Sequence, residues 1–212
     1  MEQRVREWVR GWSSCRGAPE PVEEADGFRI DVGVPGHRVR FVLPGTESVR
    51  ERAAAEPGTW LKVCGRREAV APLLDPRWVL DEPEFLMSTA LRGSGGPVAA
   101  PAGYRTGLVR EHGFHEVVVV ASDGARAARG RFAVHGGVAV VDQVVTEPAH
   151  RRRGLGRHVM STIGVHAKVR GAVVAVLVST VEGRRLYESL GWRVDSEVVA
   201  AHLPETAGPP PP

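Results

Sequence analysis

The chain has 212 residues, enough for one large domain or two small ones. Hydrophobic residues make up 42% and charged residues 25%, which is the composition of a globular protein and excludes a largely disordered one. The formal charge of +3, from 28 basic and 25 acidic residues, is a weak excess. Where the arginines cluster therefore matters more than how many there are.

Two cysteines, Cys15 and Cys64, indicate no disulfide framework. The charged N-terminal residues contain no apolar core of signal-peptide length, and no run approaches the ~18 apolar residues of a membrane-spanning helix. The histidines and cysteines show no spacing typical of a metal site. We therefore expect a cytoplasmic protein with no membrane partner and no metal.

The first part of the chain has an irregular pattern. Apolar residues at helical spacing predict an amphipathic helix near the N-terminus; they are Val5, Trp8, Val9 and Trp12. The other elements expected there are two strands within 27–43, a short helix at 48–55 and a strand at 60–64. Residues 71–91 contain several prolines and no clear element. The Gly-, Ser- and Pro-rich stretch 92–103 is the best linker, so we predict an N-terminal α+β region over 1–97.

Residues 104–203 have a clearer pattern. The expected elements are strands at 104–110, 116–121, 127–134 and 138–146, a helix from 155, a strand at 172–178 and a second helix ending at 190. Strand–helix–strand–helix after a meander predicts an α+β fold with a parallel crossover inside a mostly antiparallel sheet. We assign this domain to 98–205 and expect a disordered Pro-rich tail at 206–212.

The stretch VVTEPAHRRRGLGRHVM, 144–160, is the most informative for function. A strand ends at Thr146, and a cluster of arginines and glycines then opens a helix. Its residues are Arg151, Arg152, Arg153, Gly154, Leu155, Gly156 and Arg157. Glycines at a helix start let the backbone approach a ligand, the free amides there face an anion, and arginines add forked donors. We interpret the turn as a pyrophosphate cradle. A solvated helix start and contacts with nucleic-acid phosphates stay open, although the scattered aromatic residues disfavour the latter.

Two segments resemble motifs of the GCN5-related N-acetyltransferase (GNAT) superfamily. HRRRGLGRHVM is similar to its acetyl-coenzyme A (CoA) binding motif, Arg/Gln-x-x-Gly-x-Gly/Ala, here on Arg151, Gly154 and Gly156. RRLYESLGW is similar to its Leu-Tyr-Glu-x-Leu-Gly-Phe signature, with Trp192 in place of Phe. The resemblance covers about 104–203 and implies a splayed parallel pair of strands with flanking helices.

The resemblance also implies how acetyl-CoA, the acyl donor, is held. Its pantetheine arm is expected to pair with backbone groups of Val144, Val145 and Thr146, and its pyrophosphate to meet the amides of 152–157. Thr180 stands where many members have an asparagine that contacts the cofactor. This is a departure from the pattern, although a threonine hydroxyl can still donate a hydrogen bond.

Two residues are candidates for acid–base catalysis. Tyr187, in the second motif, is expected to protonate the departing thiolate as general acid; the alternative is a core tyrosine with a structural role. Asp142 alternates with Val144 and Thr146 along the strand, so we expect it on the same sheet face as a candidate general base. A polar residue at a strand irregularity is the alternative for Asp142.

These observations predict an acyl-CoA-dependent N-acyltransferase that moves acetyl directly to a small-molecule or peptide amine in a ternary complex. The helices that GNAT proteins carry between their first two strands are missing, because only a short turn joins 110 to 116. The N-terminal region is therefore expected to pack on the catalytic domain and wall the acceptor pocket. The alternatives are another acyl donor or an oxygen acceptor, a catalytically silent CoA-binding module and a basic nucleic-acid binder. The oligomeric state is left open, a homodimer included.

Overall fold

The computed structural model describes residues 1–91 and 98–205. Part of the predicted linker and the predicted Pro-rich tail at 206–212 lie outside these residues. The N-terminal elements are α1 (Glu2–Arg16), β1 (Val22–Glu24), β2 (Gly27–Ile30), β3 (Val39–Leu43), α2 (Val49–Ala53), β4 (Thr59–Cys64), α3 (Arg67–Val70), the 3₁₀ helix η1 (Ala71–Leu73), β5 (Val79–Leu80) and β6 (Glu84–Ala90).

The C-terminal elements follow the predicted order closely. They are β7 (Tyr104–Arg110), β8 (His115–Ala121), β9 (Arg126–His135), β10 (Val138–Thr146), the 3₁₀ helix η2 (Pro148–His150), α4 (Leu155–Val169), β11 (Val174–Thr180), α5 (Val181–Ser189) and β12 (Arg193–His202). None of the helices in the described residues is long and apolar enough to cross a membrane.

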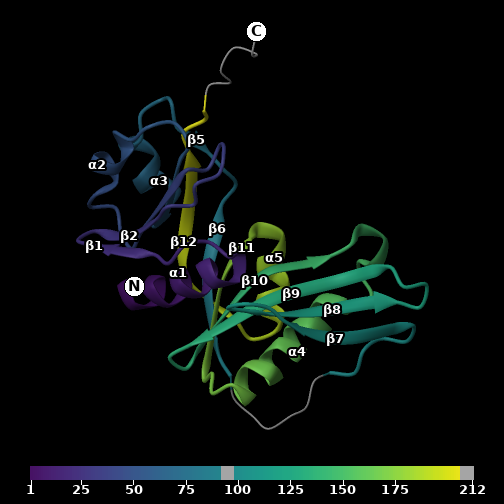
Figure 1. Cartoon of the computed structure of the whole chain (residues 1–212). Coiled ribbons are helices and arrows are strands. Elements are labelled where there is room, and N and C mark those ends of the chain that lie inside the picture. Colours follow the sequence, from purple (N-terminus) through teal and green to yellow (C-terminus); the bar gives the residue numbers. More distant parts are fainter. Residues whose placement is uncertain (92–97, 206–212) are drawn as a thin grey trace.

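All strands join one mixed sheet of order β1-β2-β3-β4-β12-β6-β11-β10-β9-β8-β7, with β5 paired to β12 (Figure 1). Neighbouring strands are mostly antiparallel, and the parallel pairs among the described residues are β10 with β11 and β3 with β4. The predicted α+β fold with a parallel crossover is confirmed. The second parallel pair, β3 with β4, was not predicted.

Strand β6 lies in the proline-containing stretch for which the sequence predicted no element. It pairs with β11 on one side and β12 on the other, so it occupies the middle of the sheet. Phe85, Leu86 and Met87 are all buried, because both sheet faces are covered at this point. A strand covered on both faces loses the alternation that reveals a strand in a sequence. The sheet runs across the boundary predicted after residue 97, and that division stays a prediction.

Helix α1 covers one face of the sheet, and the other helices cover the opposite face (Figure 1). Its apolar stripe packs on side chains from both halves of the sheet, including Val42 of β3, Val140 of β10 and Val176 of β11. Gly11 allows a close approach, because a Cβ there would lie 2.3 Å from Val140. Burial of four large α1 side chains contributes about 1.5–3 kcal/mol each; they are Val5, Trp8, Val9 and Trp12.

Candidate active site

The parallel strands β10 and β11 separate after a short paired segment. Their register joins Val138–Val140 with Val174–Val176, and both strands then continue without pairing to each other, β10 as far as Thr146 and β11 as far as Thr180. The far sides of both strands stay paired, with β9 and β6. The result is an opening between two strands whose outer edges are held fixed.

A β-bulge in β10 begins at this opening. The register with β9 shifts between Asp142 and Val145, and Gln143 has a φ of 52°, which is uncommon for a non-glycine residue. The predicted alternation of Asp142 with Val144 and Thr146 is therefore wrong. Because the bulge adds a residue, Asp142 faces α1, whereas Val144 packs into the core beneath α4.

The arginine-glycine turn lies directly after β10, at the start of α4. Arg152 and Gly154 have φ values of 61° and 79°, so the chain turns sharply before the helix. A Cβ on Gly154 would meet no atom within 4 Å, which means that this point of the turn is open. The amides of Leu155, Gly156 and Arg157 precede the first hydrogen bond of the helix, which runs from His158 N to Gly154 O. These amides are free to meet an anion.

The arginines of the turn are exposed and differ in their contacts. Arg151 Nε donates to the Thr146 carbonyl oxygen at 3.3 Å. Arg153 Nη1 donates to Tyr104 Oη at 3.1 Å, and that oxygen lies 3.0 Å from His150 Nδ1. The Thr146 carbonyl, one of the groups expected to pair with pantetheine, thus already has a weak partner. Leu155 contributes only backbone, because its side chain is buried in the core.

Thr180 begins α5 at the end of β11. Its Oγ1 accepts a hydrogen bond of 3.1 Å from Gly183 N and so caps the helix. The side chain is exposed, and the hydroxyl proton stays available for donation. The structure therefore gives Thr180 a capping role that its sequence position did not reveal.

Tyr187 lies on α5 with 8% of its surface exposed, and its ring centroid is 5.8 Å from that of Trp192. Its phenol forms no hydrogen bond with any described residue. Burial, and then the negative charge of Asp142, raise the pKa of Tyr187 to about 12. At neutral pH the phenol is therefore protonated and can donate. Tyr187 and Asp142 belong to opposite sheet faces, so this interaction acts across the sheet where the strands separate.

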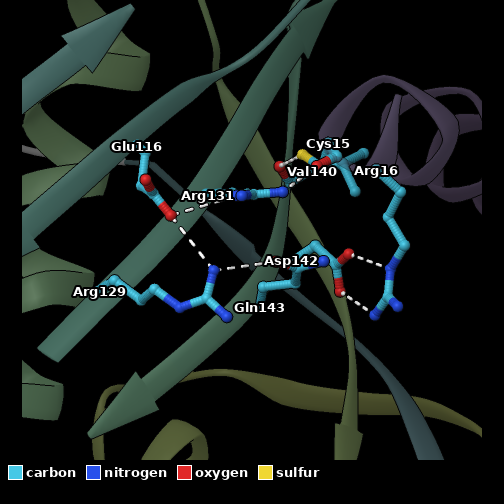
Figure 2. A network of polar contacts seen from close by, with 8 residues as sticks. All are labelled: Cys15, Arg16, Glu116, Arg129, Arg131, Val140, Asp142 and Gln143. Atoms are coloured by element: carbon cyan, nitrogen blue, oxygen red, sulfur yellow. Dashed lines mark hydrogen bonds and ion pairs between the residues drawn. The ribbon is translucent and has the colours of Figure 1, made fainter. Parts of the chain in front are cut away.

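Asp142 is held by Arg16, the last residue of α1. Arg16 Nε lies 2.7 Å from Oδ2, and Nη2 lies 3.2 Å from Oδ1, so both carboxylate oxygens accept a hydrogen bond (Figure 2). The Asp142 side chain is 13% exposed, against 42% for Arg16. A carboxylate that is engaged on both oxygens is less suited to take a proton from an amine than a free one.

A second polar group beside Asp142 locks the end of α1 to the sheet. Glu116 Oε1 accepts from Arg131 Nε at 3.2 Å and from Arg129 Nη1 at 3.3 Å (Figure 2). Arg129 also donates to Gln143 Oε1 at 3.2 Å, and Arg131 Nη1 donates to the Cys15 carbonyl at 3.1 Å. Arg131 thereby satisfies one of the last carbonyls of α1 and places a positive charge at the negative end of the helix.

Sequence reasoning missed Arg16, Glu116, Arg129 and Arg131. The only local signal was the spacing of Arg129 and Arg131, which places two arginines on one face of β9. Nothing in the sequence indicated which carboxylate they would share, because Glu116 belongs to another strand.

Residues 113–194 match the model of the acetyltransferase (GNAT) domain. This part of the chain is a GNAT domain. It contains the opening between β10 and β11, the arginine-glycine turn and Tyr187, so the resemblance found in the sequence is confirmed. No curated protein matches the chain.

Solved structures of GNAT proteins match nearly the whole chain in fold. A GCN5-related N-acetyltransferase from Kribbella flavida is 21% identical, with a TM-score of 0.64 and 97% of each chain covered. A GNAT-family protein from Novosphingobium aromaticivorans is 19% identical, with a TM-score of 0.58 over 95% of this chain and 99% of the other. One from Sphaerobacter thermophilus is 13% identical, with a TM-score of 0.59 over 87% and 79%. The N-terminal strands are thus part of an architecture that these proteins share.

The GNAT domain has a donor set that fits acetyl-CoA, the usual cosubstrate of this family. The turn before α4 combines unpaired helix amides, an open Gly154 and exposed arginines, and these are the groups that bind a pyrophosphate. Among the described residues, no group of three or more His, Cys, Asp or Glu side chains could hold a metal ion.

Proposed function

We propose that the protein is an acyl-CoA-dependent N-acyltransferase that moves acetyl directly to an amine acceptor in a ternary complex. The observation that carries the proposal is the separation of β10 from β11 after Val140 and Val176, immediately before the arginine-glycine turn. Strands that stop pairing but stay extended leave backbone groups available to a third extended chain. The pantetheine arm has that shape, and its pyrophosphate would then meet the start of α4.

The proposed binding residues act in two groups. Backbone groups of Val144, Val145 and Thr146 line the β10 side of the opening, and the Thr180 hydroxyl lies at its β11 side. The turn holds the pyrophosphate through amides and guanidinium groups of residues 151–157. The Thr146 carbonyl oxygen accepts one hydrogen bond of 3.3 Å from Arg151 Nε and keeps a second lone pair for this contact.

Tyr187 is the proposed general acid. Its buried phenol stays protonated at neutral pH and lacks a hydrogen-bond partner among the described residues, so its proton is available to the thiolate that leaves when the amine attacks the thioester. Asp142 is the proposed base. It lies across the sheet from Tyr187, on the side of α1, and its interaction with Arg16 would have to loosen for it to accept a proton.

A catalytically silent acyl-CoA-binding module is the second candidate. The observation that favours it is the double hydrogen bond from Arg16 to Asp142, which leaves the candidate base engaged. Both candidates require the turn to bind CoA, and only the enzyme releases free thiol in the presence of an amine.

Titration calorimetry with acetyl-CoA tests binding, and a thiol-release assay over a panel of amines tests transfer. Gly154→Val should weaken acetyl-CoA binding by about 1–3 kcal/mol, roughly 5- to 150-fold, because a side chain fills the space that the anion needs. Gly124→Val is the matched control: Gly124 has a φ of 88° in an open turn between β8 and β9, so it carries the same backbone strain away from the cradle. Equal affinity in both variants, with the fold intact, would refute the cradle.

A further inference from the structure

Arg40 is a buried arginine that pairs with no carboxylate of the described residues. It lies on β3 with 7% of its surface exposed, and its guanidinium carbon is 4.4 Å from the ring centroid of Trp12 and 5.7 Å from that of Trp60. Across the residues that the structure describes, its side chain forms no ion pair, and Nε is fully enclosed without a hydrogen bond. Only Nε is enclosed in this way, so the two terminal nitrogens still reach the surface.

The carboxylates near Arg40 already have other partners. Glu84 pairs with the buried Lys62, and Asp142 pairs with Arg16. Asp81 lies 3.2 Å from His202 Nδ1, a contact that is an ion pair only when the histidine is protonated. An uncompensated charge in a buried place costs stability unless a group supplies what is missing. Arg40 is therefore a buried cation that contacts the faces of Trp12 and Trp60 but is hydrogen-bonded to none of these carboxylates.

His37 provides a second, independent observation at the same place. Its ring centroid lies 4.9 Å from that of Trp60, and its Nε2 is buried without a hydrogen-bond partner. Burial, followed by the charges of Arg40, Arg16 and Lys62, lowers the pKa of His37 to about 4. The ring is therefore neutral and can donate one hydrogen bond without adding charge. His37 and Arg40 thus both contact Trp60, and each has one buried nitrogen without a hydrogen bond to any described residue.

Trp12 connects Arg40 to the side of the opening that faces α1. The guanidinium carbons of Arg40 and Arg16 lie 4.4 and 5.4 Å from its ring centroid, and Arg16 holds Asp142. Burial, and then the charge of Arg16, lower the pKa of Arg40 to about 10, and the charges of Glu84, Asp142 and Asp81 oppose this change. Asp142 also acts on Tyr187 from the other face of the sheet. The charge of Asp142 therefore acts on Arg40 on one face of the sheet and on Tyr187, the candidate general acid, on the other.

We propose that Arg40, with His37, binds a carboxylate of the acceptor, so that the acceptor is an amine that also carries a carboxylate, such as an amino acid. This inference rests on the proposed acyl transfer. An acceptor whose carboxylate lies on Arg40 extends toward Asp142 and the opening, where its amine meets the thioester. The amine loses a proton, its nitrogen bonds to the acyl carbon as the carbon–sulfur bond breaks, and the sulfur leaves as thiolate to be protonated.

The chemistry of the group favours a carboxylate over a phosphate. Arg16, Arg40 and Lys62 carry three positive charges, and Asp142, Glu84 and Asp81 carry three negative charges, so these neighbouring charges are balanced before a ligand binds. A ligand with one negative charge disturbs this balance less than a ligand with two. A planar carboxylate carries one negative charge and matches the two accessible nitrogens of one guanidinium. A phosphate dianion carries about twice that charge.

The test compares amino acids with their carboxamides as acceptors of acetyl from acetyl-CoA. The ratio of kcat/KM for acid over amide is measured in the wild type and in Arg40→Met, which keeps an apolar chain between the tryptophans. Differences in intrinsic amine reactivity cancel when this ratio is compared between proteins. We expect the ratio to fall about tenfold or more in Arg40→Met, because a charge-assisted interaction is lost. Arg126→Met, an exposed arginine on β9, is the matched control and should leave the ratio unchanged.

An unchanged ratio in folded Arg40→Met overturns the proposal. O-phosphoethanolamine against ethanolamine forms a second arm, and dependence on Arg40 in that arm alone overturns the assignment to a carboxylate. Arg40→Met loses the cation–π contacts with Trp12 and Trp60 together with the charge, and Arg40→Gln serves as a second variant if Arg40→Met does not fold.

A binding measurement separates this proposal from the proposed transfer. The thermal midpoint is measured with N-acetyl amino acids and with their neutral amides at constant ionic strength. The wild type should be stabilised by at least one of the acids and by none of the matching amides, and Arg40→Met by neither. If no amine is acetylated but this pattern is seen, transfer fails and the carboxylate site stands. If no acid stabilises the wild type, the site fails whatever the transfer assay shows.

Discussion

In the described part of the chain the sheet contains two parallel strand pairs; β10 and β11 separate, whereas β3 and β4 do not. In the N-terminal half, β3 and β4 pair along the whole of β3, from Val39 with Thr59 to Leu43 with Val63. In the GNAT domain, β10 and β11 pair over three positions and then separate. Both pairs are joined by a crossover that contains a helix, so the crossover alone does not create a site.

The difference arises within the first strand of each pair and in the segment after it. β3 has no register shift, and its apolar side chains pack on both faces, with Val42 under α1 and Leu43 against α2. β10 contains the bulge at Gln143, and the arginine-glycine turn comes after it. A bulge bends its strand and breaks the ladder. Closed pairing thus builds the scaffold, and the bulge converts the same motif into a place where a ligand can enter.

Removal of the N-terminal half, which contains the closed pair, is expected to have the largest effect on folding. A chain that starts at Val98 should fail to form soluble, folded protein, because β11 loses its seven pairs with β6 and β12 loses its partners on both sides. Soluble yield, gel filtration and circular dichroism measure the effect. Co-expression of residues 1–97 as a separate chain should restore folding if the sheet reassembles. A soluble, active protein from Val98 alone would contradict the prediction.

The next largest effect, on kcat, is expected at Tyr187, which lies on α5 after the open pair. Tyr187→Phe should lower kcat about 10²-fold, near the low end for general acid catalysis, and leave acetyl-CoA affinity nearly unchanged, since the ring still fills its space. Tyr104→Phe is the matched control: the Tyr104 hydroxyl contacts Arg153, so its loss should change affinity rather than kcat. A wild-type kcat in Tyr187→Phe, with chemistry rate-limiting, would make Tyr187 a packing residue.

The structure also sets the pH at which Tyr187 can be detected. Because its pKa is raised to about 12, an alkaline change in rate below pH ~10 does not report its titration. The pH–rate profiles of wild type and Tyr187→Phe should therefore have the same shape up to that pH. This differs from what an ordinary tyrosine pKa would predict.

The smallest effect is expected at His37, in the closed half. Its folded pKa of about 4 lies below the ordinary 6.5, so between these values the unfolded chain binds the proton more strongly. The stability contributed by neutral His37 is complete above pH ~6.5 and is lost as the pH falls toward 4. His37→Gln should flatten this fall in thermal midpoints measured from pH 7.5 to 5. His112→Gln, at an exposed turn, should change nothing.

The local features of the site could be predicted from the sequence. The strand ending at Thr146, the glycines before α4 and the four-residue apolar spacing of α4 depend on neighbours in the chain, so their pattern is visible before folding. The family motifs around Gly154 and Tyr187 lie on these same elements. The domain division, the acceptor and the roles of Tyr187 and Asp142 stay predictions.

The residues that face the opening from the side of α1 could not be predicted, because long-range contacts place them. Arg16 reaches Asp142 across 126 positions of sequence, and β6 enters the middle of the sheet from a stretch that lacks any strand pattern. The sheet face on which Asp142 lies depends on the bulge at Gln143. Arg40 lacks an ion pair because Asp142 is paired with Arg16 and Glu84 with Lys62. Such features arise from contacts between distant segments, and no local spacing encodes them because each residue's environment exists only after the sheet has closed around α1.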